Sequence, residues 1–117
     1  MTAGGTGAAP DGLDGLFAAL ADAGRRTMVE RLAVGPASVK DLALAAEMRL
    51  PSAVKHLHVL ERGGLVVSRK LGRTRTYSIA PDALQSLRAW VSRREAEINA
   101  AFDRLEALIA EEETTEP

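Results

Sequence analysis

Apolar residues recur along the first third of the chain at helical spacing. A first helix is predicted by an i, i+3, i+4, i+7 stripe of Leu13, Leu16, Phe17 and Leu20. We expect Gly24 to break this helix, because glycine is unfavourable in a helix interior. A second helix is predicted over about residues 25–34 and ends at Gly35-Pro36, where neither residue favours continuation.

Two further helices follow after a short interval. Ser38 and Asp41 have the spacing of a capping pair, so a third helix is predicted to begin there. Pro51 suits the first turn of a fourth helix, because its missing N–H would have no intrahelical partner. The fourth helix is predicted to end at Gly63-Gly64 and to bury three apolar residues, Ala53, Leu57 and Leu60.

The periodicity then changes from helical to alternating. Residues 65–70 and 74–79 are rich in Val, Thr, Tyr and Ile, which favour strands, and a turn is predicted at 71–73. A long last helix is predicted from Pro81. The predicted fold class is therefore mainly α with a small β-hairpin wing: a winged helix-turn-helix with a long C-terminal dimerisation helix.

Length and composition narrow the possibilities. A chain of 117 residues suffices for one domain. We expect an N-terminal tail over 1–12, a domain over 13–110 and an acidic tail over 111–117. The absence of cysteine excludes disulfides and thiolate metal sites. Neither a signal peptide nor a membrane span is evident, so we expect a cytoplasmic protein.

The net charge of -1 conceals a basic central region. From Met48 to Pro81 there are seven Lys or Arg residues and one acid, Glu61, which gives 7 - 1 = +6. Acidic residues gather at the C-terminal end instead, at 111–113 and 116. Such asymmetry is typical of proteins with an anionic partner, and it favours DNA here.

The fourth helix supplies candidate DNA-contacting residues. With Leu57 and Leu60 facing inward, the outer face is predicted to carry Ser52, Lys55, His56 and His58. Three of them have an alternative interpretation: Ser52 as a residue that suits the first turn of a helix, Lys55 as solvated surface, and His56 as a core histidine. His58 cannot share the face of His56, so the pair is a poor metal chelate.

The hairpin supplies a second group of candidates. Four cations lie in or beside its predicted turn: Arg69, Lys70, Arg73 and Arg75. Charge on an edge strand also protects against aggregation, which is the alternative interpretation. Because four cations without an acid exceed that need, we expect contacts to phosphates or to the minor groove.

The last helix has an apolar stripe at near-heptad spacing. A helix of about 30 residues would span roughly 45 Å, which is longer than so small a domain. We therefore expect a second copy to cover part of the stripe; the alternative interpretation is a helix that folds back on its own domain. The predicted interface residues on this helix are Leu87, Trp90, Val91, Ile98, Phe102 and Leu105.

The chain resembles the ArsR-type (arsenical-resistance repressor-like) winged helix-turn-helix regulators. The most specific matching stretch runs from His56 to Val66, and weaker matches lie at 16–22, Arg25-Arg26 and 39–42. The resemblance covers roughly residues 13–105. It implies a homodimer that represses by occupying an operator, with dimerisation through the first helix (Leu13, Leu16, Phe17, Leu20) as well as the last.

The resemblance also shows where this chain departs from the family. Members that sense metals use Cys pairs in the third helix or His and acidic residues on the last; here 44–47 reads Leu-Ala-Ala-Glu, and the last helix contains no His. The sequence is therefore similar to a metal-independent branch, and no metal or cofactor is expected. Val54 stands where many members carry Ser, and we hypothesise that it touches a thymine methyl group.

The residues described above favour three possible functions to different degrees. The leading prediction is a sequence-specific DNA-binding repressor acting on an inverted repeat, without catalytic residues. The alternative is a protein-interaction module on a winged-helix scaffold that does not read DNA specifically; the segregated charge disfavours it. An enzyme is disfavoured because no serine–histidine–acid arrangement can be read from the chain. Whether a small-molecule effector binds between the first and last helices is left open by the sequence.

Overall fold

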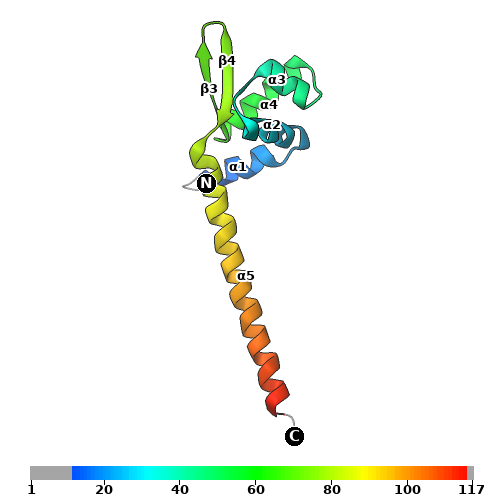
Figure 1. Cartoon of the computed structure of the whole chain (residues 1–117), viewed down its shortest axis with the longest axis vertical. Coiled ribbons are helices and arrows are strands. Elements are labelled where there is room, and N and C mark those ends of the chain that lie inside the picture. The colour runs from blue at the N-terminus through cyan, green and yellow to red at the C-terminus, as the bar shows by residue number, and fades with distance from the viewer. Residues whose placement is uncertain (1–11, 116–117) are drawn as a thin grey trace, which may run out of the picture. The chain divides into compact units, whose positions relative to one another are not determined.

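The computed structural model describes residues 12–115. It divides into two compact units that meet within the last helix, at Ser86 and Leu87. We call residues 12–86 the winged unit and residues 87–115 the C-terminal helix segment. The elements follow in the order α1 Leu13–Leu20, α2 Ala23–Val34, β2 Ala37–Ser38, α3 Val39–Ala45, α4 Leu50–Arg62, β3 Val66–Leu71, β4 Thr74–Ile79 and α5 Pro81–Thr115 (Figure 1). The predicted fold class is confirmed.

The corner between α1 and α2 lies earlier than expected. α1 carries the predicted stripe but ends at Leu20, and α2 begins at Ala23, so Gly24 lies inside α2 and does not break a helix. The reason is Asp22, whose carboxylate Oδ2 accepts from the Arg25 backbone N–H at 2.9 Å and caps α2. A Cβ on Gly24 would lie 3.1 Å from Met48 Cε, so close packing favours glycine there.

α1 and α4 meet at a pair of glycines. A Cβ built on Gly63, at the end of α4, would lie 2.7 Å from the Gly15 backbone oxygen and 3.0 Å from Ala19 Cβ. The two backbones therefore approach within a distance that no larger residue permits. Gly64 follows with φ 84, the left-handed conformation that ends the helix and that glycine adopts readily.

The helix-turn-helix is formed by α3 and α4. The hydroxyl of Ser38 accepts from the Asp41 backbone N–H at 3.2 Å, which confirms the predicted cap of α3. α4 carries Pro51 in its first turn, as predicted. Its inward residues are those that the periodicity indicated, since Ala53, Leu57 and Leu60 are completely buried.

The hairpin belongs to a three-stranded sheet of order β2-β4-β3. β3 and β4 pair in antiparallel register from Val66↔Ile79 to Leu71↔Thr74, so Leu71 belongs to a strand and not to the predicted turn. β2 was not predicted; its two residues pair with β4 through Ala37↔Tyr77 and Ser38↔Thr76. A two-residue strand has no periodicity, so only its distant partner reveals it.

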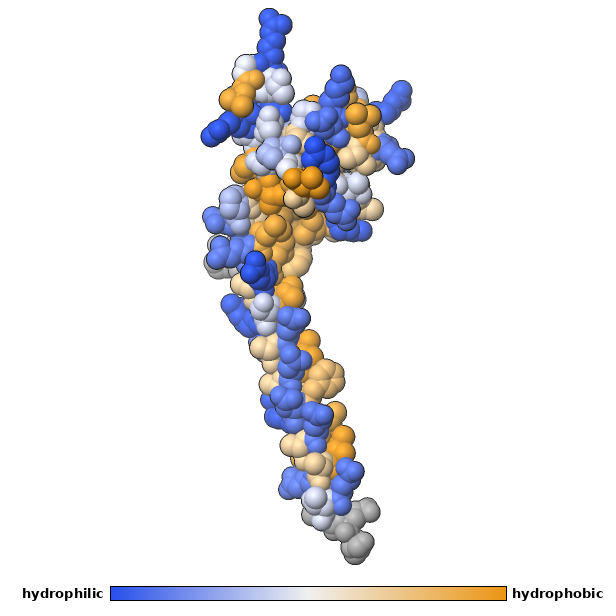
Figure 2. Space-filling model, viewed as in Figure 1, coloured by the Kyte–Doolittle hydropathy of each residue, from blue (hydrophilic) through white to orange (hydrophobic). Residues whose placement is uncertain are grey.

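The C-terminal helix segment is longer than expected. α5 continues through Glu111, Glu112 and Glu113 to Thr115, so the boundary predicted at residue 110 falls inside the helix. From Val91 onward its large aliphatic and Phe side chains are exposed, from 45% for Val91 to 61% for Leu108. Figure 2 shows this apolar surface along the helix, between polar side chains.

No helix among residues 12–115 is long and apolar enough to cross a membrane. The predicted tail over 1–12 lies, except for Gly12, outside the described residues.

Candidate nucleic-acid interface

Polar side chains cover the outward face of α4. Ser52, Lys55, His58 and Arg62 are all exposed, and their spacing puts them on one side of the helix, opposite Leu57 and Leu60. Val54 lies on one flank of this stripe and is 39% exposed. Arg62 was counted in the basic region but not predicted as a contact, although its position seven residues after Lys55 is the signal that identifies it.

His56 lies on the other flank of α4 and turns inward. Its side chain is 28% exposed, and its Nδ1 lies 3.2 Å from Arg25 Nη1 and 4.0 Å from Asp22 Oδ2. Of the four polar residues predicted for the outer face, His56 is thus the one that packs against α2. This placement favours the alternative interpretation of His56 as a histidine satisfied inside the protein.

The wing carries its cations on two opposite faces. Side chains alternate along each strand, so Lys70 and Arg75, which are cross-strand partners, lie on the same face as Ser68 and Tyr77. That face packs toward α4, because the Ser68 hydroxyl donates to Glu61 Oε2 of α4 at 2.9 Å. The same hydroxyl accepts from Arg75 Nη1 at 2.8 Å, which links α4, β3 and β4.

Tyr77 completes the packed face of the hairpin. It is 6% exposed, and burial raises the pKa of its hydroxyl, to which the nearby Glu61 carboxylate adds. The phenol therefore stays protonated at neutral pH and serves packing. Sequence reasoning gave no sign that Glu61 would lie beside this ring, since the two are brought together only by the fold.

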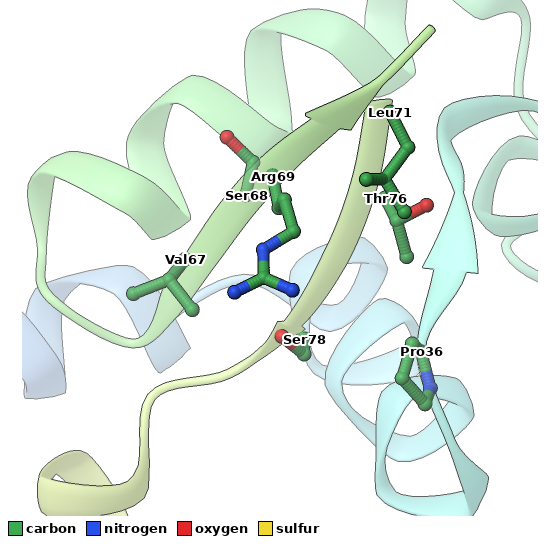
Figure 3. A pocket seen from close by; sticks show the side chains of 7 residues that line it. All are labelled: Pro36, Val67, Ser68, Arg69, Leu71, Thr76 and Ser78. Carbon is green, nitrogen blue, oxygen red and sulfur yellow. The ribbon is translucent and has the colours of Figure 1, made fainter. Parts of the chain in front are cut away.

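Arg69 lies on the other face of the hairpin. Figure 3 shows it beside Val67, Leu71, Thr76 and Ser78, facing a groove of about 430 Å³ whose opposite wall includes Pro36. Sequence reasoning grouped Arg69 with Lys70, Arg73 and Arg75, because it could not assign strand faces without the register. Arg73 follows Gly72 in the turn and is exposed.

Comparison with known proteins bears directly on this arrangement. The chain is 41% identical to the HTH-type transcriptional regulator Rv2034 of Mycobacterium tuberculosis over 80 residues. This match covers 68% of this chain and 75% of that protein. It also matches the crystal structure of the ArsR family transcriptional regulator RHA00566, at 40% identity and a TM-score of 0.69, over 75% of this chain and 97% of the other. The chain belongs to the ArsR family of winged helix-turn-helix transcriptional regulators.

A further solved structure shows the oligomeric state of one relative. The winged helix-turn-helix DNA-binding domain Mb0332 from Mycobacterium bovis is homodimeric; it is 33% identical, with a TM-score of 0.61, over 74% of this chain and 81% of that one. No protein-family model matches the chain. The family membership of this ArsR-type chain therefore rests on the relatives and on the shared fold.

The described part of this chain has no group of side chains that could bind a metal ion. Among residues 12–115, no three His, Cys, Asp or Glu side chains gather at one point where a metal ion could bind.

The interface residues predicted on α1 differ in exposure. Phe17 is 42% exposed and Leu13 and Leu20 are half-buried, whereas Leu16 is 3% exposed and packs in the core of its own chain.

Proposed function

We propose that the protein is a homodimeric repressor that recognises a specific DNA sequence with α4 and the wing. The observation that carries this proposal is the exposed polar stripe of α4 beside the cationic, α4-facing side of the hairpin. An α-helix fits the major groove, and a two-stranded wing reaches neighbouring phosphates or the minor groove. A repressor needs only to occupy its operator, and these two elements suffice for that.

The proposed contacts divide into positioning and reading. Ser52, Lys55, Lys70, Arg73 and Arg75 bind phosphates, which supplies affinity without sequence preference. His58 and Val54 face base edges, with Val54 against a thymine methyl group. His56 and Arg69 are left out of this surface, because one turns toward α2 and the other lies on the opposite face of the hairpin.

The proposed dimer uses the apolar stripe of the C-terminal helix segment. Val91, Ile98 and Leu105 recur at intervals of seven residues, and Phe102 and Ile109 lie beside them, all of them exposed. Leu87 and Trp90 extend the proposed interface toward the start of the helix. Leu13, Phe17 and Leu20 of α1 contribute as well. The homodimeric state of the relative from Mycobacterium bovis supports the proposal of a homodimer. Leu16 is not included, because it is buried.

The proposed mode of regulation does not use cysteine thiolates, since the chain has none. A DNA partner implies that the protein acts in the cytoplasm. An inverted-repeat operator follows from the proposed two-fold symmetry, which presents two copies of α4 about one helical turn, ~34 Å, apart.

The deciding experiment is selection of bound duplexes from a random library by the purified protein, with its mass in solution measured in parallel. We expect a dimer that enriches an inverted repeat, and we expect Lys55→Ala to reduce binding to it. Enrichment of no motif, with only weak salt-sensitive binding, would overturn the proposal and favour the protein-interaction module. Enrichment of a single half-site by a monomer would retain DNA reading and reject the dimer.

A further inference from the structure

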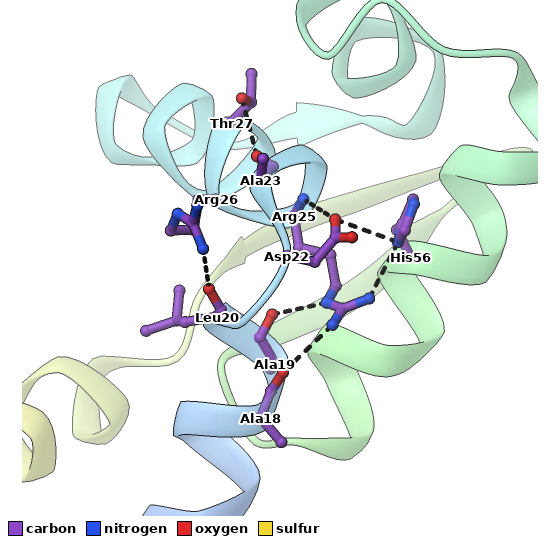
Figure 4. Close-up of polar contacts among 9 residues, drawn as sticks. All are labelled: Ala18, Ala19, Leu20, Asp22, Ala23, Arg25, Arg26, Thr27 and His56. Carbon is purple, nitrogen blue, oxygen red and sulfur yellow. Dashed lines mark hydrogen bonds and ion pairs between the residues drawn. The ribbon is translucent and has the colours of Figure 1, made fainter.

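Arg25 connects two helices that are distant in sequence. Its Nε donates to the Ala19 carbonyl at 2.7 Å and its Nη2 to the Ala18 carbonyl at 3.3 Å, both at the end of α1. Its Nη1 lies 3.2 Å from His56 Nδ1 on α4 (Figure 4). One guanidinium, anchored in α2, therefore ties the end of α1 to the middle of the DNA-reading helix. The fork of Arg donors makes this possible, whereas a Lys ammonium is a single point of charge.

The contact indicates which tautomer the neutral His56 ring adopts. A guanidinium can only donate, so His56 Nδ1 must accept, and the proton of the neutral ring resides on Nε2. The charged groups that face this ring among residues 12–115 are Arg25 of α2 and Asp22 at the N-cap of α2, while α1 contributes only the two carbonyls to Arg25. The backbone N–H of Arg25 lowers the pKa of Asp22, so this carboxylate is ionised at neutral pH.

Protonation of His56 would replace Arg25 by Asp22 as the partner of the His56 ring. With a proton on Nδ1, two cations would face each other across 3.2 Å and the Arg25 hydrogen bond would be lost, whereas Asp22 Oδ2, now 4.0 Å away, would attract the ring. The link from α1 to α4 would then open. Lys55 immediately precedes His56 in the chain. A helix that reads DNA must be held within about half an ångström for its contacts to form.

We propose that His56 is a positioning residue for α4: neutral His56 holds the helix through Arg25, and its protonation releases Arg25 and weakens DNA binding. The inference rests on the proposed function, since it concerns how α4 is presented to DNA. It also separates the two histidines of the helix, because His58 is exposed and positioned to face DNA directly. Protonation of His58 adds a cation on that face, so it favours binding as the pH falls, whereas protonation of His56 opposes it.

The first test uses the free protein. NMR follows the ring signals of His56 and the side-chain Nε–H signal of Arg25 between about pH 8 and pH 5.5, where histidines titrate. We expect the Arg25 signal to change along with the His56 titration and to be insensitive to pH in His56→Gln, whose amide oxygen accepts without titrating. An Arg25 Nε–H signal that does not change as His56 titrates would overturn the proposal, whether or not DNA affinity depends on pH.

The second test uses a labelled duplex of the sequence enriched by library selection. In a His58→Gln background, we expect affinity to fall several-fold from pH 8 to about pH 5.5, because only protein with a neutral His56 keeps the Arg25 hydrogen bond. Adding His56→Gln should abolish this fall without changing the preferred sequence. A changed preference would mean that His56 contacts bases, which overturns the positioning role.

A matched pair of arginines completes the test. Arg25→Lys should weaken binding about tenfold at pH 8, because a lysine cannot join α1 to His56. Arg26→Lys should not, because Arg26 Nη1 donates only to the Leu20 carbonyl. Equal losses in both would overturn the proposal. If the NMR coupling is present but no duplex is ever enriched, the positioning link stands in the free protein and the proposed function fails.

Discussion

The two units of this protein handle their apolar residues in opposite ways. In the winged unit, Met28, Leu42, Leu57, Leu60 and Leu65 are buried so completely that the unit has a core of its own. In the C-terminal helix segment, the large apolar residues from Val91 to Ile109 are exposed. One unit buries its own apolar side chains, whereas the other exposes an apolar stripe of the kind that marks interaction sites. The comparison teaches that a self-contained core and an exposed apolar stripe occupy different parts of one short chain.

The largest effect is expected from the core of the winged unit. Leu60→Ala removes a completely buried side chain and leaves a cavity, so the free energy of unfolding should fall by about 2–5 kcal/mol. Chemical denaturation followed by circular dichroism measures this change. A loss below about 1 kcal/mol would mean that the winged unit does not depend on this core.

The helix segment should respond in assembly and not in folding. Ile98→Asp places a charge in the proposed interface and should raise the dimer dissociation constant at least about thirtyfold, ~2 kcal/mol. Sedimentation measures this constant, and denaturation of the monomeric variant should show an intact winged unit. Ala100→Asp, half a turn away on the same helix, is the control and should leave the dimer unchanged. Equal weakening by both variants would contradict the proposed stripe.

A similar comparison can be made between the two faces of the hairpin. Lys70→Ala and Arg69→Ala remove neighbouring exposed cations that point to opposite faces. Lys70→Ala should cost about 1 kcal/mol of binding and make the plot of log K against log salt shallower by about one unit. Arg69→Ala should change neither. Identical salt slopes for the two variants would show that the face assignment does not govern phosphate contact.

The smallest effect is expected at the corner between α1 and α2. The pKa of Asp22 is lowered from its ordinary value of 3.8, chiefly by the Arg25 backbone N–H. Its ionised form therefore stabilises the fold above that value, and the contribution is lost as the pH falls through the lowered pKa. Asp22→Ala should lower the Tm at pH 7, and the gap should close in acid. Asp22→Asn, which keeps an acceptor, should lose less; a gap that is independent of pH would rule out the carboxylate charge.

Much of this fold was predictable from periodicity and end signals. The stripes of α1 and α4, the Ser38 cap and the Gly63-Gly64 stop are local features, and local features are legible in a sequence. The errors lie where a distant partner decides. Gly24 is tolerated in α2 because Asp22 caps the helix, and β2 exists only because β4 lies beside it.

The candidate site was predicted less completely, for the same reason. The fourth helix and the wing were identified from charge, and Lys55 and His58 are exposed there as expected. His56 and Arg69 were assigned to the same surface because composition does not reveal direction. Arg25 lies 31 residues before His56, and nothing in its local sequence marks it as the partner of that ring.

The glycine contact between α1 and α4 has a consequence for how this chain tolerates variation. In a saturation mutagenesis screen, position 63 should behave like a core leucine, with nearly every substitution depleted, although the residue has no side chain. Gly72, with φ 63 and no atom within 4 Å of a built Cβ, should still accept Asn or Asp, which adopt the left-handed conformation more readily than other residues. A selection experiment of this kind would therefore distinguish glycines retained for close packing from glycines retained for their backbone conformation.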